Sequence, residues 1–267
     1  MELGLQGRVS IVTGGSRGIG KSVAESLAHE GAHVVICARE AGYLNSVERE
    51  ILLLGESALS VTADVTKPAD VKRVVDTTIE KFGSLDILVN NVGGTTRFGA
   101  FSELTHDDWM RSFELNVMTM VYFVQYALPF LVQSQSPRII NISSISGVEP
   151  GFYNPHYTIT KAATINLSKY LANWLAKDQI LVNAVCPGPV YSESWNRNVQ
   201  CLAERDNLTL EEAGEIMNNQ ESLKIPLQRI GNGEDVAGLV VFLASEKAKW
   251  ITGSCFHVNG GKLRSVC

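Results

Sequence analysis

Four segments of the chain are apolar almost without interruption. They read VSIV at 9–12, HVVICA at 33–38, LDILV at 85–89 and ILVNAV at 180–185. A strand with one face in water alternates apolar and polar residues, whereas a strand buried on both faces is apolar throughout. Since the crossover helices of a parallel sheet cover both of its faces, these segments predict a parallel β-sheet between two layers of helices.

Segments with the apolar spacing of a helix lie between the strand-like runs. We expect strands at Val9–Thr13, His33–Ala38, Leu59–Ala63, Leu85–Asn90, Arg138–Ser143, Ile180–Val185 and Ser254–Val258. We expect helices at Gly18–His29, Leu44–Leu54, Pro68–Phe82, Trp109–Val132, Tyr157–Ala176 and Glu234–Ala244. Regular alternation with short loops predicts right-handed crossovers and a single doubly wound α/β domain over residues 1–267.

One long segment, Tyr191–Pro226, interrupts the alternation because it contains helix-like pieces but no strand. Its Thr209-Leu210-Glu211-Glu212 has the form of a capping box, which predicts the start of a helix. An insertion after the carboxyl end of a strand lies where open α/β sheets bind ligands. We therefore interpret residues 191–226 as a substrate lid within the domain. The alternative is a structural insertion that never touches substrate.

The composition is that of a packed globular protein. Hydrophobic residues make up 45% of the chain, charged residues 19%, and the net charge is −5. A nucleic-acid-binding protein carries excess Lys and Arg to neutralise phosphates, so we expect neither nucleic acid nor a membrane surface as a partner. The strongest apolar stretch, Val117–Val132, is interrupted by Gln125 and Pro129 and is short for a membrane span, which favours a buried helix.

The cysteines favour a reducing compartment. They are odd in number, far apart in the sequence and show no C-x-x-C spacing: Cys37, Cys186, Cys201, Cys255 and Cys267. Neither a disulfide framework nor a zinc site, nor any other metal site, is therefore expected. Met1–Arg8 lacks the pattern of a targeting segment, so we expect a cytoplasmic protein.

A glycine-rich turn, TGGSRGIG at 13–20, follows the first predicted strand and opens the first predicted helix. Glycines let backbone N–H groups approach a pyrophosphate, and the positive end of the following helix attracts it. The spacing is G-x-x-x-G-x-G rather than the usual G-x-G-x-x-G. Its position between strand and helix predicts a dinucleotide site, and the alternative is a tight turn without a ligand.

With this turn, the chain resembles the short-chain dehydrogenase/reductase family over essentially its whole length. Asn90-Asn91-Val92-Gly93 matches the family's N-N-A-G segment, and Val258-Asn259-Gly260-Gly261 resembles its V-D-G-G. The resemblance implies a Rossmann-type fold with a parallel seven-stranded sheet in the order 3-2-1-4-5-6-7 and helices on both faces. It also implies that Asp64 holds the adenine and that Ser192, in place of Thr, lies near the nicotinamide amide. For Asp64 the alternative is an acceptor at a helix start.

The expected cofactor is NADP(H). The turn, the strand ends and the resemblance together predict these contacts: Gly14, Ser16, Arg17, Gly18, Ile19, Gly20, Arg39, Asp64, Val65, Asn91, Val92, Gly93, Tyr157, Lys161, Pro187, Gly188, Val190 and Ser192.

The choice of NADP(H) over NAD(H) depends on the end of the second strand. NAD-binding units place an acidic residue there to bind the ribose 2′-hydroxyl. Here Ala38 is followed by Arg39, whose guanidinium suits a 2′-phosphate, and Arg17 of the glycine-rich turn can approach the same phosphate. The alternative is that Glu40 turns inward and binds the 2′-hydroxyl of NAD.

The candidate catalytic residues are Asn116, Ser144, Tyr157 and Lys161. Tyr157 and Lys161 are four residues apart and share a helix face, and Ser144 lies thirteen residues before the tyrosine, as in the family. Asn116 matches the family's fourth catalytic position and is expected to hold a water that links Lys161 to solvent. Ser143 is the alternative to Ser144.

The chemistry explains these residue types. Hydride transfer to a carbonyl leaves an alkoxide that needs a proton. A free tyrosine with a pKa near 10 donates that proton readily but is hard to regenerate or to use as a base near neutral pH. A positive charge about 4 Å away contributes roughly 4 kcal/mol, so Lys161 is expected to lower the pKa of Tyr157 well below that value. Ser144 would stabilise the substrate oxygen by a hydrogen bond. His156 is expected to line the pocket.

The substrate is expected to be an apolar, aromatic or acyl carbonyl compound or the corresponding alcohol. The residues that fall near the expected cleft or lid are Phe152, Tyr153, Val190, Trp195, Val199, Leu202, Ile216 and Met217. Arg197 and Arg205 either bind an acyl carrier or are solvated. The two long predicted helices are apolar enough to suggest a homo-oligomer, and the resemblance suggests a tetramer.

The resulting hypothesis is an NADP(H)-dependent oxidoreductase similar to 3-oxoacyl-carrier-protein reductases. It would transfer a hydride between the nicotinamide and a ketone or secondary alcohol. The alternatives are an NAD-dependent secondary-alcohol dehydrogenase and an inactive NADP-binding sensor or scaffold.

Overall fold

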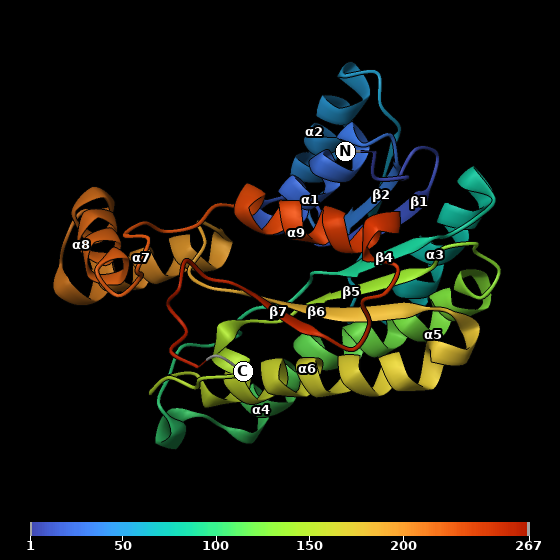
Figure 1. Ribbon diagram of the computed structural model, residues 1–267. Coiled ribbons are helices and arrows are strands. Elements are labelled where there is room, and N and C mark those ends of the chain that lie inside the picture. The colour runs from blue at the N-terminus through green and yellow to red at the C-terminus, as the bar shows by residue number, and fades with distance from the viewer. Residues whose placement is uncertain (1, 266–267) are drawn as a thin grey trace.

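The computed structural model describes residues 2–265, and its centre is one seven-stranded parallel sheet with the strand order β3-β2-β1-β4-β5-β6-β7. The strands are β1 (Val9–Thr13), β2 (His33–Ala38), β3 (Ala58–Thr62), β4 (Ile87–Asn90), β5 (Arg138–Ile142), β6 (Leu181–Pro187) and β7 (Cys255–Val258). Helices lie on both sides of the sheet (Figure 1). The predicted fold class and strand order are confirmed.

Nine α-helices are present in residues 2–265: α1 (Gly18–His29), α2 (Ala41–Leu53), α3 (Pro68–Phe82), α4 (His106–Phe113), α5 (Thr119–Leu131), α6 (Pro155–Leu175), α7 (Glu193–Asp206), α8 (Leu210–Ser222) and α9 (Gly233–Ala244). Short 3-10 turns complete the chain: η1 (Phe101–Glu103), η3 (Ile145–Gly147), η4 (Ala176–Asp178) and η5 (Glu246–Ala248). The prediction matched the bounds of β1, α1, β2 and α3, whereas most other ends differ by one to three residues.

Alternate residues of each strand supply two cores. Val12 of β1 packs with α1, α2 and α9 on one face, whereas its neighbour Ile11 packs with α3, α5 and α6 on the other. Both residues are fully buried, as the continuous apolar runs predicted.

The long helix predicted at Trp109–Val132 is wrong in two respects. A π-helical segment, η2 (Glu114–Met118), separates α4 from α5, and Asn116 lies inside it. The helix also begins earlier than predicted, because the Thr105 side chain accepts a hydrogen bond from the backbone N–H of Asp108 and caps α4. Such π-helical segments occur often at functional sites.

The insertion at 191–226 forms α7 and α8, which project beyond the sheet at the left of Figure 1. The predicted capping box is present, since Thr209 Oγ1 accepts from the Glu212 N–H and the Glu212 carboxylate accepts from the Thr209 N–H. The two helices have a core of their own, made by Trp195, Val199, Ala203, Ala213, Ile225 and Ile230.

No helix within residues 2–265 combines the length and the apolar character needed to cross a bilayer. Cys37, Cys186, Cys201 and Cys255 are free thiols, and Cys267 lies outside the described residues. The cysteines are separated in the sequence but not all in space. The Sγ atoms of Cys186 and Cys255 are 3.3 Å apart because β6 and β7 are neighbours.

Candidate active site

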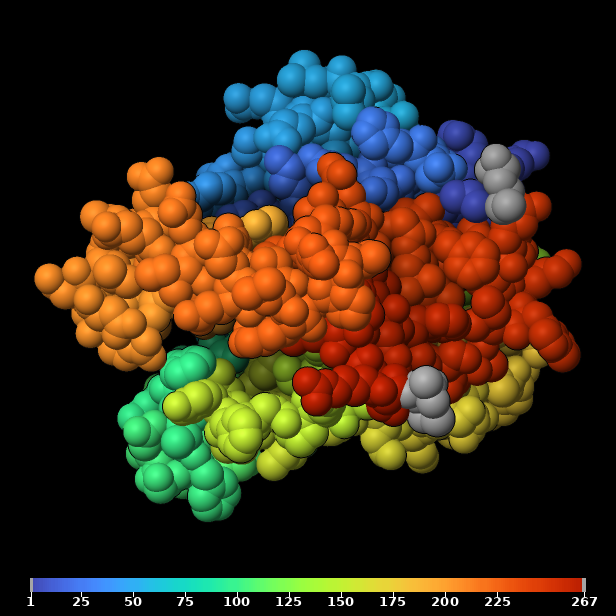
Figure 2. Space-filling view, turned by 60° about the vertical axis from the view of Figure 1, so that its left-hand side comes forward, coloured from blue at the N-terminus to red at the C-terminus, as the bar shows by residue number. Residues whose placement is uncertain are grey.

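A cavity of about 840 Å³ lies at the carboxyl ends of the strands. Figure 2 shows the helices α7 and α8 (orange) on one side of this opening and the segment around residue 100 (green) on the other. Every residue predicted to contact the cofactor lines this cavity. It also lies where open α/β sheets bind ligands.

The glycine-rich turn fits a pyrophosphate because its backbone leaves no room for side chains. A Cβ on Gly20 would lie 2.2 Å from the Gly14 oxygen, and a Cβ on Gly15 would lie 2.6 Å from a methyl of Ile36. Gly14 and Gly18 have positive φ angles of 67° and 53°. The N-terminus of α1 follows this turn, so its free N–H groups face the cavity.

Thr13, which the sequence analysis did not assign, ties the turn to the end of β4. Its Oγ1 accepts hydrogen bonds from the backbone N–H groups of Asn91 and Val92, at 2.9 and 3.0 Å. Asn91 Nδ2 donates in return to the backbone oxygen of Thr13 at 2.8 Å. A threonine at the end of a buried strand was the available signal, because its hydroxyl oxygen has two lone pairs and can accept both bonds.

The charged groups around the turn form a network. Arg17 donates to the carboxylates of Glu40 and Glu193 at 2.7 and 2.8 Å, and its guanidinium lies 4.4 Å from the ring centre of Tyr43. Arg39 also lines the cavity. A phosphate that binds Arg17 must therefore compete with two carboxylates, one of which belongs to helix α7 of the insertion.

Asp64 lines the cavity and closes a local turn. Its Oδ1 accepts from the backbone N–H and the hydroxyl of Thr66 at 3.2 and 2.8 Å. Lys67, not Asp64, is the residue before α3. The helix-start alternative is thus not what the structure shows.

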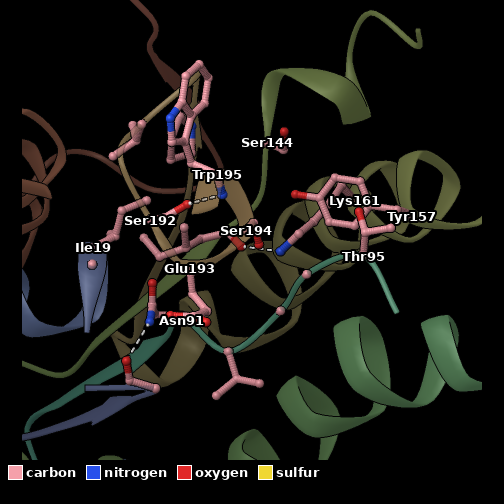
Figure 3. A pocket seen from close by; sticks show the side chains of 18 of the residues that line it. Ile19, Asn91, Thr95, Ser144, Tyr157, Lys161, Ser192, Glu193, Ser194 and Trp195 are labelled. Carbon is pink, nitrogen blue, oxygen red and sulfur yellow. Dashed lines mark hydrogen bonds between the residues drawn. The ribbon is translucent and has the colours of Figure 1, made fainter. Parts of the chain in front are cut away.

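Three of the four candidate catalytic residues face the cavity together. Ser144 follows β5, and Tyr157 and Lys161 lie one turn apart on α6. Figure 3 shows the three side chains around one space. Lys161 Nζ donates to the Ile142 oxygen at 2.9 Å and lies 5.8 Å from the centre of the Tyr157 ring.

Asn116, the fourth candidate, is buried and does not line the cavity. Its Nδ2 donates to the oxygens of Gly94 and Ser112, and its Oδ1 accepts from the Gly94 N–H at 2.8 Å. A Cβ on Gly93 would lie 2.7 Å from both Asn116 Oδ1 and Lys161 Nζ. Asn116 and Lys161 thus converge on Gly93, where only a hydrogen atom fits.

The geometry distinguishes the two serines. Ser143 is buried, and its Oγ donates to the Lys161 oxygen at 2.7 Å. Ser144 Oγ accepts from the Ser146 N–H at 3.1 Å and still has its own proton to donate. The arrangement favours Ser144 over Ser143 as the group that meets a substrate.

The predicted lowering of the tyrosine pKa is not found. Desolvation raises the pKa of Tyr157 above its ordinary value, and a hydrogen bond with Ser144 only partly offsets this. Desolvation also lowers the pKa of Lys161 to about 8. The predicted pKa of Tyr157 included the attraction between the phenolate and the ammonium. It did not include the free-energy cost of burying both groups.

Of the residues expected near the cleft or the insertion, Tyr153, Val190, Trp195 and Met217 line the cavity. Three others lie in the insertion away from the cavity: Val199 and Leu202 pack in its core, and Ile216 lies on its surface. Phe152 is 98% exposed and does not line the cavity.

The prediction that His156 lines the pocket is wrong. His156 is buried with its ring 6.2 Å from that of Trp109, away from the cavity, and burial lowers its pKa.

Polar residues that the sequence analysis missed or left as solvated also line the cavity. Ser194, Arg197 and Asn198 lie on one face of α7, with Arg197 donating to Ser194 at 3.2 Å. Their i, i+3, i+4 spacing was the available signal. Glu221 and Lys262 form an ion pair at the cavity, which no sequence pattern indicated because 41 residues separate them.

Comparison with known proteins agrees with this geometry. The family model described as enoyl-(acyl carrier protein) reductase matches residues 14–262. The 3-oxoacyl-[acyl-carrier-protein] reductase of Staphylococcus epidermidis is 36% identical over 253 residues, 94% of this chain and 97% of the relative.

Two solved structures resemble the whole chain. L-sorbose reductase from Gluconobacter frateurii, complexed with NADPH and L-sorbose, has a TM-score of 0.93 at 34% identity and covers 100% of both chains. The NADPH-dependent reductase YwfH, involved in bacilysin biosynthesis, has a TM-score of 0.89 at 29% identity over 97% of this chain and 99% of that one. With the match over residues 14–262, these similarities show that the chain belongs to the short-chain dehydrogenase/reductase family.

Proposed function

We propose that the protein is an NADP(H)-dependent oxidoreductase that reduces a ketone to a secondary alcohol or catalyses the reverse oxidation. One observation supports this above the others: Ser144, Tyr157 and Lys161 meet in the same cavity that contains the glycine-rich turn. A dinucleotide on the turn and a carbonyl at Ser144 would therefore share one enclosed space.

The roles follow from the donors available. The bound cofactor supplies the hydride to the carbonyl carbon. Tyr157 gives its proton to the carbonyl oxygen, and Ser144 donates a hydrogen bond that strengthens as negative charge develops there. The Lys161 ammonium stabilises the tyrosinate that remains, and Asn116 is proposed to order the water that returns the proton from solvent.

A preference for NADP(H) is supported by two basic residues at the cavity, Arg17 and Arg39. Guanidinium groups bind a phosphate through paired charge-assisted hydrogen bonds. The two solved relatives described above are NADPH-dependent or contain NADPH. The carboxylate of Glu40, the alternative partner for the 2′-hydroxyl of NAD, instead accepts a hydrogen bond from the Arg17 guanidinium.

For the substrate, we propose an apolar or acyl ketone of the 3-oxoacyl type. The similarity to 3-oxoacyl-[acyl-carrier-protein] reductases and the aromatic and thioether groups of Tyr153, Trp195 and Met217 support it. The second candidate is a polyhydroxylated ketone, favoured by the polar groups of Ser194 and Asn198 and by the similarity to L-sorbose reductase. Lid function of residues 191–226 is part of either proposal.

We also propose a homotetramer in the cytoplasm. Exposed apolar side chains on α4 and α6 support self-association: Met110, Phe113, Ile159, Tyr170 and Trp174. The four free thiols of residues 2–265 suit a reducing compartment. Light scattering after size-exclusion chromatography tests the assembly, and a monomer would contradict it.

The test of the activity is NADPH oxidation with three substrates: a 3-oxoacyl thioester, a ketose and a simple aromatic ketone. Turnover of the thioester supports the first candidate, and turnover of the ketose alone supports the second. NADPH binding without turnover of any ketone would support the rival hypothesis of an inactive sensor. Tyr157→Phe is the control that separates enzymatic from background oxidation.

A further inference from the structure

Three possible metal ligands lie together at the edge of the sheet. Cys186 is on β6, and Cys255 and His257 are on β7, with their ligand atoms within 4.8 Å of one another. The two Sγ atoms are 3.3 Å apart, and Cys255 Sγ is 3.8 Å from His257 Nε2. The function proposed above uses none of these side chains.

The strand register creates this cluster. Cys186 pairs with His257, and Ala184 pairs with Cys255. Residues two apart on a strand point to the same face, so Cys255 and His257 project together. Cys186 shares its face with Val182, which packs in the core on the α6 side of the sheet. All three side chains therefore emerge on that side, on rigid strands rather than on a loop.

A metal ion fits this geometry better than a disulfide bond does. Cys186 and Cys255 are offset by two residues on adjacent strands, which places their Cα atoms about 8 Å apart at ordinary strand spacings. A disulfide needs less than about 7 Å. In a tetrahedral zinc site the ligand atoms are about 3.5–3.8 Å apart, given zinc–sulfur and zinc–nitrogen bonds near 2.3 and 2.0 Å. The observed 3.3 and 3.8 Å lie close to that spacing.

We propose that Cys186, Cys255 and His257 bind one Zn²⁺ ion, with water as the fourth ligand. Each thiol releases its proton to solvent on binding, and the imidazole binds through its neutral nitrogen. Two thiolates and an imidazole select zinc over magnesium or calcium, which prefer oxygen ligands. Cys186 is buried, whereas Cys255 and His257 are partly exposed on the edge strand, which gives the ion a path from solvent.

The site lies close to the cavity. Cys186 directly precedes the cavity-lining Pro187 and Gly188, and its strand β6 pairs with β5, which leads to Ser144. A bound ion would fix the edge strand β7 to β6 at the floor of the cavity. Zinc is thus expected to raise the melting temperature of the protein without cofactor or substrate.

The first test is titration of chelator-treated full-length protein with Co²⁺, followed by displacement with Zn²⁺. We expect one equivalent of Co²⁺ to produce thiolate-to-cobalt charge-transfer absorption. Cys255→Ser and His257→Gln should each weaken binding by at least about 100-fold, more than the loss of an outer-shell partner. Cys201→Ser, which alters an exposed cysteine on the lid, should bind as the wild type does.

Circular dichroism of each variant establishes that it is folded, and Cys255→Ser and His257→Gln avoid the fully buried Cys186. Absence of the charge-transfer band in the wild type, or a band that survives both substitutions, would overturn the proposal.

The second readout is alkylation followed by peptide mapping. Zn²⁺ should protect Cys255 but not Cys201, and equal alkylation of Cys255 with and without Zn²⁺ would also overturn it.

Discussion

Replacing Gly93 with alanine tests whether the position of the Lys161 ammonium controls the rate. The added Cβ would lie 2.7 Å from Lys161 Nζ and 2.7 Å from Asn116 Oδ1, well inside van der Waals contact. Gly93 does not have a positive φ, so alanine acts through these contacts alone. Asn116 is held by hydrogen bonds to Gly94 and Ser112, and the flexible Lys161 side chain is therefore the group that moves.

The magnitude follows from what Lys161 loses. Its 2.9 Å hydrogen bond to the Ile142 oxygen would break, and a bond from a charged donor contributes about 1.5–3 kcal/mol. For a chain of this size, that predicts a melting temperature lower by about 3–12 °C. A misplacement of about 1 Å can reduce the rate by on the order of 100-fold. We expect kcat/KM to fall by about that factor.

The assay is steady-state oxidation of NADPH with the best ketone substrate, alongside thermal unfolding. Gly238→Ala is the matched control, because a Cβ at this exposed position of α9 meets nothing within 4 Å. The double variant Gly93→Ala/Lys161→Ala should be no slower than Lys161→Ala alone, since both changes act on one ammonium. A Gly93→Ala enzyme with more than a third of wild-type kcat/KM, or additive losses in the double variant, would refute the reasoning.

Four further outcomes are expected. Tyr157→Phe should keep less than about a tenth of turnover with nearly unchanged NADPH affinity by fluorescence titration, because phenylalanine retains the ring but donates no proton. Arg39→Asp should remove a preference for NADPH over NADH of about two orders of magnitude, as compared by kcat/KM, and equal values in the wild type would contradict this. Burial lowers the pKa of Lys161 to about 8, so the ammonium is present below that pH and lost above it; the pH profile of the reduction should fall above about 8, and Lys161→Arg should move this limb upward. Glu193→Gln removes one carboxylate from Arg17 and should tighten NADPH binding by up to about fivefold without affecting the affinity for NADH. Equal effects on the two affinities would exclude competition between Glu193 and the 2′-phosphate for Arg17.

The fold and the cofactor pocket were predictable because local patterns determine them. Continuous apolar runs place β1 and β2 in the sheet interior, where both are buried. Parallel strands bring their carboxyl ends to one edge. Residues at or just after the carboxyl end of a strand, such as Asn91, Ser144 and Pro187, therefore had to meet near the glycine-rich turn, whatever the details of packing.

The predictions that proved wrong depend on contacts between segments that are distant in the sequence. Nothing in the sequence shows that the His156 ring packs against Trp109, or which face of the insertion 191–226 lies toward the cavity. The neighbouring positions of Cys186 and Cys255 depend on the register of β6 against β7, which the spacing of cysteines along the chain does not encode. The pKa of Tyr157 depends on how deeply the phenol is buried. The distance between the two charges alone therefore predicts a lowered pKa, whereas burial raises it.

The π-helical segment η2 makes the length of the helical region 106–131 matter as much as its composition. One residue more or less rotates everything beyond it by about 100°, the angle between successive residues of a regular helix. With the segment as it is, α4 packs against α6 while α5 packs against α3. Deletion of a single residue from the regular turns of α4 or α5 would turn one of these two apolar faces toward water. The helical region 106–131 is thus expected to tolerate substitutions far more readily than a change in its length.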